Sequence, residues 1–316
     1  MENDNTSDIA VMKRIFDIVQ HTLEFLIVFI RIILELCISL VQLFIPKKLK
    51  DVSKEIVLIT GTGHGIGREL ALHYTVLGST VICIDINEKN NEVTVKKAKR
   101  LNAGSVYSYT CDVTDRNAVL QLADRIKNEI GLVSVLVNNV GIMPTHPFEQ
   151  QTADEIRQVF EINVFSQFWT LQAFLPHMKQ QNHGHITAMS SIAGLVGNAN
   201  VVPYCASKFA VRGLMEALHE ETRTGPYKNK ITGSVIYPYM TNTGLCKKPI
   251  IKFPSVLGLL DPKVVAEHIV EAHRANIREV TIPSSLLYIN NWCRVLPVNC
   301  ALLLKDFIGG GLGSDL

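Results

Sequence analysis

The stretch EIVLITGTGHGIGRELAL, residues 55–72, decides the fold. It opens with aliphatic residues typical of a buried strand and ends with apolar residues at helical spacing. Between them lies Thr60-Gly61-Thr62-Gly63-His64-Gly65-Ile66-Gly67. Gly61, Gly65 and Gly67 let the main chain turn tightly, and the free amides at a helix start favour an anionic phosphate. A strand, a glycine turn and a helix in this order predict a dinucleotide-binding site of the Rossmann type.

Strands and helices alternate along the rest of the region. Further strands are expected at residues 80–85, 105–111, 133–138, 185–190, 231–237 and 279–282. Helices are expected at residues 65–77, 90–101, 117–130, 153–181, 203–223 and 262–275. Apolar strands joined by helices imply a parallel sheet that is covered on both faces. The sequence therefore predicts an α/β fold with a doubly wound parallel sheet of about seven strands.

Composition excludes several classes of protein. Hydrophobic residues make up 47% of the 316 residues and charged residues 19%, which excludes a disordered chain. Polar stretches such as 85–101 exclude a membrane protein with many spans. With 31 Lys and Arg against 29 Asp and Glu, no basic field favours a nucleic-acid partner. The seven cysteines form no CxxC pair or histidine cluster, so we expect free thiols, a reducing compartment and no metal site.

Residues 9–45 hold much of the apolar excess, and three lysines follow at 47, 48 and 50. A secretory signal does not fit, because the segment is too long and has an acidic leader. On a helix, its polar residues would form one stripe within roughly a 60° arc. The stripe consists of Lys13, Asp17, Gln20, Glu24, Arg31, Glu35 and Gln42. This pattern predicts a membrane anchor over residues 1–52, as a helix lying in the lipid surface, with a tilted span over 23–45 as the alternative.

Asp85 ends the second expected strand, 18 residues after Gly67. A carboxylate at this place accepts hydrogen bonds from the adenosine ribose and repels a 2′-phosphate. No Arg or Lys lies at positions 62–64 or directly after Asp85, so the sequence favours NAD over NADP. The alternative is that Asp85 only caps the following helix.

Tyr204 and Lys208 stand four residues apart on one face of an expected helix, and Ser191 precedes Tyr204 by 13 residues. A phenol is a poor base at neutral pH, and we expect the neighbouring ammonium to lower its pKa by stabilising phenolate. The Ser191 hydroxyl could hold a substrate oxygen beside the phenol. A Tyr–Lys pair at this spacing is common by chance, and taken alone it favours an exposed pair on a helix face.

Several motifs in order resemble the short-chain dehydrogenase/reductase family over about residues 54–285. Besides the glycine turn they are Cys111-Asp112-Val113, Asn138-Asn139-Val140-Gly141, Asn163, Ser191 and the Tyr204/Lys208 pair. The resemblance implies a catalytic set of Asn163, Ser191, Tyr204 and Lys208, with Asn163 joining a water-mediated proton relay. It implies a cofactor site of Gly61, His64, Gly65, Ile66, Gly67, Asp85, Asp112, Val113, Asn139, Gly141, Tyr204, Lys208, Pro238 and Thr243.

The apolar N-terminal helix, Gly184-His185-Ile186 and Asn242-Thr243-Gly244 narrow the resemblance to a membrane- and lipid-droplet-associated branch. This branch holds 17β-hydroxysteroid, retinol and epidermal retinol dehydrogenases. It implies a homodimer at the endoplasmic reticulum membrane or lipid droplet, with a cytosolic catalytic domain at 53–285. It also implies NAD-dependent oxidation of a lipophilic alcohol: a retinol, a steroid or a long-chain alcohol.

Two apolar segments suit such a substrate: an expected lid at 245–260 and a C-terminal tail at 286–316. Packing of these segments on the core or in a dimer contact is the alternative. Two other functions stay open at this point. One is NADPH-dependent reduction of a lipophilic carbonyl, and the other is a non-catalytic lipid-droplet protein that keeps the fold. The intact catalytic set disfavours the second.

Overall fold

The computed structural model describes residues 2–42, 45, 48–225 and 230–315. The chain divides into two compact units, Met1–Lys48 and Leu49–Leu316. The first unit contains α1 (Glu2–Gln42), a helix of 41 residues, and Lys47 of the basic cluster lies outside the described residues. Within its polar stripe the Gln20 amide donates to Glu24 at 3.0 Å. Among the described residues, no helix combines the length and apolarity that a membrane crossing requires.

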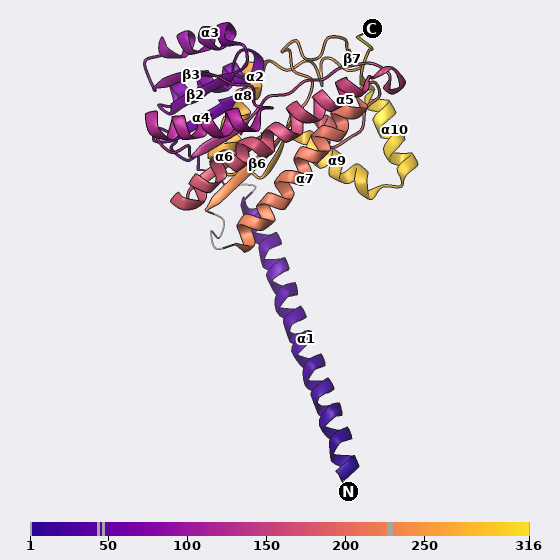
Figure 1. The fold of residues 1–316 in the computed structure, drawn as a ribbon. Coiled ribbons are helices and arrows are strands. Elements are labelled where there is room, and N and C mark those ends of the chain that lie inside the picture. Colours follow the sequence, from indigo (N-terminus) through magenta and orange to yellow (C-terminus); the bar gives the residue numbers. More distant parts are fainter. Residues whose placement is uncertain (1, 43–44, 46–47, 226–229, 316) are drawn as a thin grey trace. The chain divides into compact units, whose positions relative to one another are not determined.

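The second unit is built on a seven-stranded sheet with the order β3-β2-β1-β4-β5-β6-β8. Figure 1 shows β2 and β3 of this sheet side by side among the helices. Every neighbouring pair in it is parallel, which confirms the predicted sheet. The strand order reverses between β1 and β4, and such a switch point is where open α/β sheets bind ligands. The strands are β1 (Ile56–Thr60), β2 (Thr80–Asp85), β3 (Val106–Thr110), β4 (Val135–Asn138), β5 (Gly184–Met189), β6 (Ile231–Pro238) and β8 (Glu279–Ile282).

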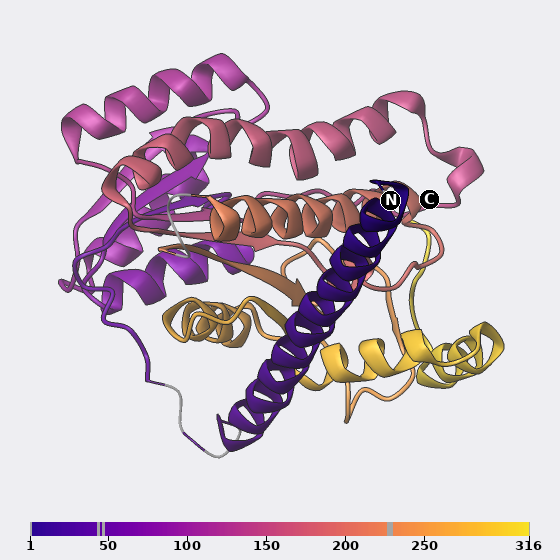
Figure 2. The ribbon, with the colours of Figure 1, turned by 90° about the horizontal axis from the view of Figure 1, so that it is seen from below.

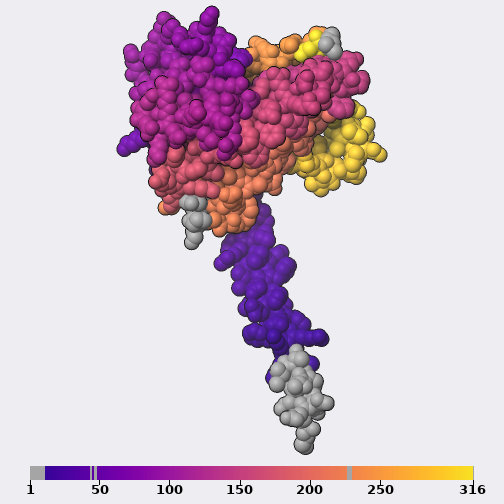
Figure 3. Space-filling view, viewed as in Figure 1, coloured from indigo at the N-terminus to yellow at the C-terminus, as the bar shows by residue number. Residues whose placement is uncertain are grey.

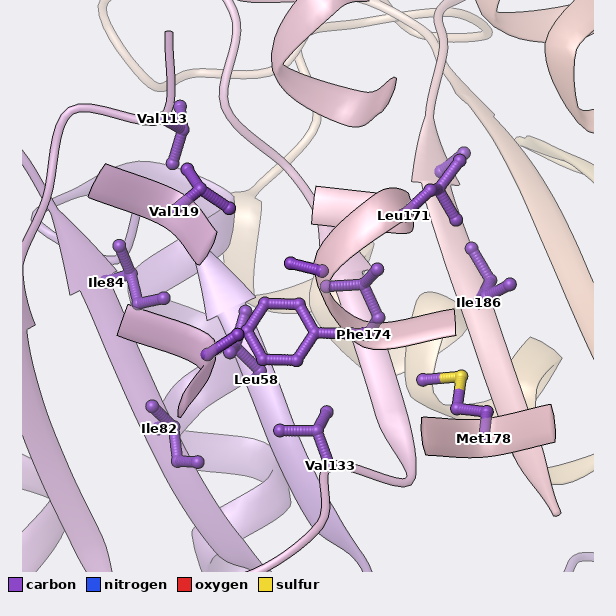
Figure 4. Packing of buried hydrophobic residues seen from close by; sticks show 14 of the residues in the cluster. Leu58, Ile82, Ile84, Val113, Val119, Val133, Leu171, Phe174, Met178 and Ile186 are labelled. Atoms are coloured by element: carbon purple, nitrogen blue, oxygen red, sulfur yellow. The ribbon is translucent and has the colours of Figure 1, made fainter. Parts of the chain in front are cut away.

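Helices cover both faces of the sheet, as predicted (Figure 2). One face carries α2 (Gly65–Val76), α3 (Glu88–Lys99) and α8 (Pro262–Arg274), and the other carries α4 (Arg116–Glu129), α6 (Ser166–Gln181) and α7 (Val202–Thr224). Alternate strand residues point to opposite faces, so Leu58 joins the core under α4, α6 and α7, while Val57 and Ile59 join the other. Figure 4 shows Phe174 of α6 lying close to Leu58.

The helix expected over residues 153–181 is interrupted. It consists of α5 (Ala153–Phe160), the π-helical turn η2 (Glu161–Phe165) and then α6. Thr152 and Glu155 form a capping box at the start of α5. Two 3₁₀ turns, η1 (Phe148–Gln150) and η3 (Ile192–Gly194), follow β4 and β5. The extra residue of a π-helical turn shifts the helix face, and such turns are frequent at functional sites.

The apolar C-terminal segment folds into elements that the sequence did not predict. These are α9 (Ser285–Val295), α10 (Val298–Ile308) and β9 (Gly310–Leu312). β9 pairs antiparallel with β7 (Pro249–Ile251), which lies inside the expected lid. In the space-filling view of Figure 3, the yellow C-terminal residues form a lobe at one side of the second unit.

Candidate active site

A cavity of about 370 Å³ lies at the carboxyl ends of the strands. The segments that follow β1, β2, β3, β4, β5 and β6 all contribute to its wall, and α7 adds Tyr204 and Lys208. The structure therefore brings together nearly every residue predicted for the site. The lining includes Gly61, His64, Gly65, Ile66, Gly67, Asp85, Asp112, Val113, Asn139, Gly141, Ser191, Tyr204, Lys208, Pro238 and Thr243. Asn163 is fully buried behind the wall.

The glycine turn forms a cradle at the start of α2. Gly61 and Gly65 have φ of +74° and +57°, in the left-handed region that favours glycine. A side chain at Gly67 would collide with the Gly61 carbonyl oxygen. His64 caps α2 without a side-chain hydrogen bond, and no acidic residue stands in the first turn. The amides at this helix start therefore suit the pyrophosphate of a dinucleotide.

Asp85 joins two neighbouring turns at the adenosine end of the cavity. One carboxylate oxygen accepts from the Gly63 amide at 2.7 Å, and the other accepts from the Asn87 amide at 2.8 Å. Asn87 in turn caps α3 through the Asn90 amide. The interpretation of Asp85 as the cap of α3 is thus wrong, because the cap is Asn87 and Asp85 only holds the Asn87 amide. Asp85 also lines the cavity, as the ribose interpretation requires.

Asn139 and a residue that the sequence analysis missed fix the glycine turn from behind. The Asn139 amide donates to the carbonyl oxygens of Thr60 and Gly61 at 2.9 and 3.2 Å. Asn91 of α3 is fully buried and bonds the Thr62 hydroxyl at 2.5 Å. A lone Asn in a polar helix gave no sequence signal, because its role depends on which helix face meets β2.

Asn163 lies in the π-helical turn η2, and its side chain forms hydrogen bonds with the loop after β4. Its side-chain oxygen accepts from the Ile142 amide at 2.8 Å. Its side-chain nitrogen donates to the Ile142 carbonyl and to the Ser207 hydroxyl, both at 3.0 Å. Both amide hydrogens of Asn163 are therefore engaged with protein. Gly141 lies directly in front of it, where an added Cβ would come within 3.3 Å of both the Asn163 oxygen and Lys208.

Tyr204 and Lys208 lie buried at the centre of the cavity wall. The Lys208 ammonium donates to the Met189 carbonyl at 2.9 Å and lies 5.6 Å from the centre of the Tyr204 ring. Burial lowers the pKa of Lys208 to about 8. Burial also raises the pKa of Tyr204, and its hydrogen bond with Ser191 opposes that rise. The expected lowering of the phenol pKa is therefore wrong for the protein alone, because the loss of hydration on burial is the largest effect on Tyr204.

Thr243, which the resemblance assigns to the cofactor site, lies against the glycine turn. A Cβ added at Gly65 would be 3.0 Å from the Thr243 side chain. Thr241 also lines the cavity, but its hydroxyl donates to the Tyr239 carbonyl at 2.9 Å. Within the part of the chain that the structure describes, no three His, Cys, Asp or Glu residues are grouped to hold a metal ion.

The substrate half of the cavity has an apolar wall that the sequence analysis did not assemble. Met143 follows β4, Leu245 and Cys246 follow β6, and Leu312 comes from β9. These residues form a small cluster that also contains Tyr204. The cavity thus joins a polar cradle for a dinucleotide to an apolar space, and the phenol lies where they meet.

Comparisons with known proteins agree with this geometry. The short chain dehydrogenase family matches residues 55–250. Human epidermal retinol dehydrogenase 2 is 38% identical over 271 residues, covering 86% of this chain and 87% of its own. Human estradiol 17-beta-dehydrogenase 11 is also 38% identical, covering 84% and 87%.

Solved structures show the same fold. A short-chain dehydrogenase/reductase from Burkholderia phymatum in complex with NAD has a TM-score of 0.69 and 25% identity, covering 77% of this chain and 94% of its own. A metagenomic short-chain oxidoreductase in complex with NADP has a TM-score of 0.62 and 25% identity, covering 73% and 97%.

A glycine cradle at the switch point of a parallel sheet, facing a buried tyrosine and lysine, defines a nicotinamide-dependent oxidoreductase. The chain belongs to the short-chain dehydrogenase/reductase family and is an NAD(P)-dependent oxidoreductase. The curated relatives confirm the branch that the sequence motifs indicated, since retinol and estradiol dehydrogenases are among them.

Proposed function

We propose that this enzyme oxidises a lipophilic alcohol to its carbonyl with NAD. The observation that carries the proposal is the position of Tyr204, which lines the cofactor cavity and packs in the apolar cluster with Met143 and Leu312. A proton acceptor that faces both spaces suits an alcohol whose carbon chain is apolar. Curated relatives named as retinol and estradiol dehydrogenases support a substrate of this kind.

Different residues of the cofactor site would bind different parts of the dinucleotide. The amides from Gly61 to Gly67 would hold the pyrophosphate, and Asp85 would accept from the adenosine ribose. Asp112 and Val113 would hold the adenine, and Pro238 and Thr243 would lie at the nicotinamide. Bound NAD supplies the hydride acceptor for the alcohol carbon. We propose NAD over NADP because the carboxylate of Asp85 would face the 2′ position.

The chain's own residues handle the proton. Ser191 would hold the substrate oxygen, and Tyr204 would take the hydroxyl proton. Burial lowers the pKa of Lys208 to about 8, which brings the titration of this group nearer to neutral pH. Its ammonium lies 5.6 Å from the centre of the Tyr204 ring, where its positive charge would favour phenolate. We assign Asn163 a positioning role, because both hydrogens of its amide already bond protein atoms; the water-mediated relay stays a prediction.

A panel of lipophilic alcohols tests the proposal. Retinol, a 17β-hydroxysteroid and a long-chain alkanol are assayed with NAD and with NADP on membrane-embedded enzyme. We expect turnover of at least one alcohol and a preference for NAD. A clear preference for NADPH and carbonyl reduction would establish the reductase alternative instead.

Tyr204→Phe is the matched variant, since it removes one oxygen atom. We expect turnover to fall at least about 1000-fold, because the variant lacks the group that accepts the hydroxyl proton. NADH affinity is expected to stay within about twofold. NADH fluorescence and steady-state rates measure the two quantities. Turnover close to that of the unchanged enzyme would exclude Tyr204 as the base.

A lipid surface is the second proposed partner. α1 presents one polar stripe on an apolar surface, and α9 and α10 expose Trp292, Val295, Val298 and Phe307. Exposed apolar residues of this kind favour an interface between water and lipid. We propose attachment to the endoplasmic reticulum membrane or to lipid droplets, with α1 lying in the surface and the catalytic unit in the cytosol.

We also propose a homodimer, as the family resemblance implies. Phe165 of η2, Phe168 of α6 and Phe209 of α7 are 40%, 39% and 37% exposed, so these helices offer aromatic rings to a second copy.

A further inference from the structure

The last described residues of the chain form part of the cavity wall. Leu312 of β9 lines the cavity although it lies more than a hundred residues after Tyr204. Its side chain is 9% exposed and packs in the cluster that contains Tyr204, Met143 and Ala193. No sequence motif near β9 predicts that Leu312 lines the cavity, because β9 is a short glycine-rich strand.

Three separate loops hold β9 in place. Its pairing with β7 sets Leu312 opposite Pro249. The Asn200 side chain, from the loop before α7, donates to the Leu312 carbonyl at 2.7 Å. The Asp315 amide donates to the Thr145 carbonyl at 2.6 Å, in the loop after β4. The strand therefore ties together the lid, the loop after β4 and the loop after β5.

Other contacts fix the segment on both sides of β9. The Gly313 amide donates to the Lys248 carbonyl at 2.9 Å, and Asp315 pairs with Lys247 at 3.4 Å. The Lys305 ammonium of α10 donates to the Gly197 carbonyl at 2.6 Å. Gly309 ends α10 with φ of +60°, in the conformation that lets the chain reverse into β9.

We infer that Leu312 is a specificity-determining residue: its side chain sets how wide a lipophilic alcohol can be beside Tyr204. The inference rests on the proposed function and deepens it. The lid strand β7 and β9 form a two-stranded antiparallel sheet, so the position of Leu312 is set by main-chain pairing. A side chain held in this way acts as a fixed wall for the substrate.

Substitutions at residue 312 test this in two directions. Leu312→Ala removes volume, and we expect the ratio of kcat/KM for a bulky secondary alcohol over a slim primary alkanol to rise about 10-fold. Leu312→Phe adds volume, and we expect the same ratio to fall about 10-fold. NADH affinity is expected to stay within about twofold in both, since the cradle lies at the other end of the cavity.

Two further variants distinguish an effect of Leu312 on the width of the cavity from a general effect of substitution on the enzyme. Leu303→Ala of α10 removes the same atoms at a site that is 70% exposed, so its ratio is expected to match the unchanged enzyme. Asn200→Gly removes the bond to the Leu312 carbonyl and keeps the left-handed backbone, where Asn200 has φ of +65°. We expect it to raise KM for the bulky alcohol about 3- to 10-fold with NADH affinity unchanged.

Direct binding distinguishes failure of this inference from failure of the proposed function. If the unchanged enzyme turns over no alcohol, the proposed function falls, and retinol fluorescence still reports occupancy of the apolar space. Leu312→Phe is then expected to weaken retinol binding at least about 10-fold, with NADH binding intact. Unchanged selectivity in an active enzyme, or unchanged retinol affinity in an inactive one, would overturn the role of Leu312.

Discussion

Asp85 shows how one side chain can serve structure and recognition together. Its two oxygens hold the Gly63 amide and the Asn87 amide, so the carboxylate is fixed in direction before any ligand arrives. A fixed acceptor loses little entropy when a ribose binds. A charge at this position also repels a second phosphate, which is the physical basis of the proposed NAD preference.

Replacing that carboxylate gives a residue-level prediction. Asp85→Ser should weaken NAD binding about 10-fold and raise the ratio of NADP to NAD affinity, because it removes both an acceptor and a negative charge. Glu88→Ser, at the start of the same helix, is the control and should leave the ratio unchanged. Titration of both nicotinamide nucleotides measures it, and an unaltered ratio for Asp85→Ser would remove the case for NAD.

The polar half of the site was predictable because strand ends converge. Asp85 ends one parallel strand, and Asn139 and Ser191 follow two others. The carboxyl ends of such strands meet at one edge of the sheet. The environment of Tyr204 was not predictable in the same way. Its burial raises the phenol pKa, and burial depends on Leu312 and other residues distant in sequence.

At the scale of elements, η2 places Asn163 beside the loop after β4. Asn163→Ala should lower the free energy of unfolding by about 3 kcal/mol, since it leaves both main-chain polar groups of Ile142 without their side-chain partner. It should also lower kcat more than it changes NADH affinity. Denaturant unfolding and steady-state kinetics measure the two effects.

Asn163→Asp is the informative companion. It keeps the acceptor for the Ile142 amide and loses both donated bonds, so it should recover part of the stability and little of the rate. Full activity in either variant would argue against the positioning role.

Periodic sequence patterns explain which elements could be predicted. All seven strands of the sheet were expected, because apolar runs bounded by turns are a strong signal. The π-helical turn was not, since one extra residue in a helix leaves the amphipathic pattern nearly intact. β9 was missed because its residues, Gly310–Leu312, have no strand signature of their own. The bonds from Asn200 and Thr145 that hold this segment appear only in the folded chain.

For the whole molecule, a pair of buried histidines ties stability to pH. His185 of β5 and His273 of α8 lie with ring centres 4.2 Å apart and ring planes tilted by 33°, and the Tyr74 hydroxyl is hydrogen-bonded to His273 at 2.9 Å. Burial lowers the pKa of both rings, to about 3 for His273. Below pH 6.5 the two histidines bind protons in the unfolded chain but stay neutral in the folded chain. The free energy of unfolding therefore decreases as the pH falls.

Each ring should cost roughly 1.4 kcal/mol of stability per pH unit below 6.5, down to its folded pKa. Guanidinium unfolding of the detergent-solubilised chain at pH 7 and pH 5 measures the loss. His273→Gln cannot titrate and should reduce the loss by about half. An equal loss in this variant would show that other groups control acid sensitivity.

Membrane attachment gives a prediction for the whole chain. Removing residues 2–45 should move the protein from the membrane pellet to the supernatant, because α1 exposes large apolar side chains from Val11 to Val41. If the shortened protein stays in the pellet, the paired change Trp292→Ser and Val295→Ser tests whether α9 holds it there. Retention after both changes would contradict the proposed lipid contacts.

The place of β9 also bears on how the enzyme is made. Gly310 leaves the ribosome 243 residues after Gly67, which takes roughly 12 to 50 s at about 5–20 residues per second. During that interval the cofactor cradle can form while the apolar space beside Tyr204 lacks one wall. Until β9 is made, the nascent chain therefore exposes the apolar residues that line the cavity beside Tyr204. The cavity wall is complete only after Leu312 has been synthesised, so we expect ligand binding in the apolar space to begin later than cofactor binding.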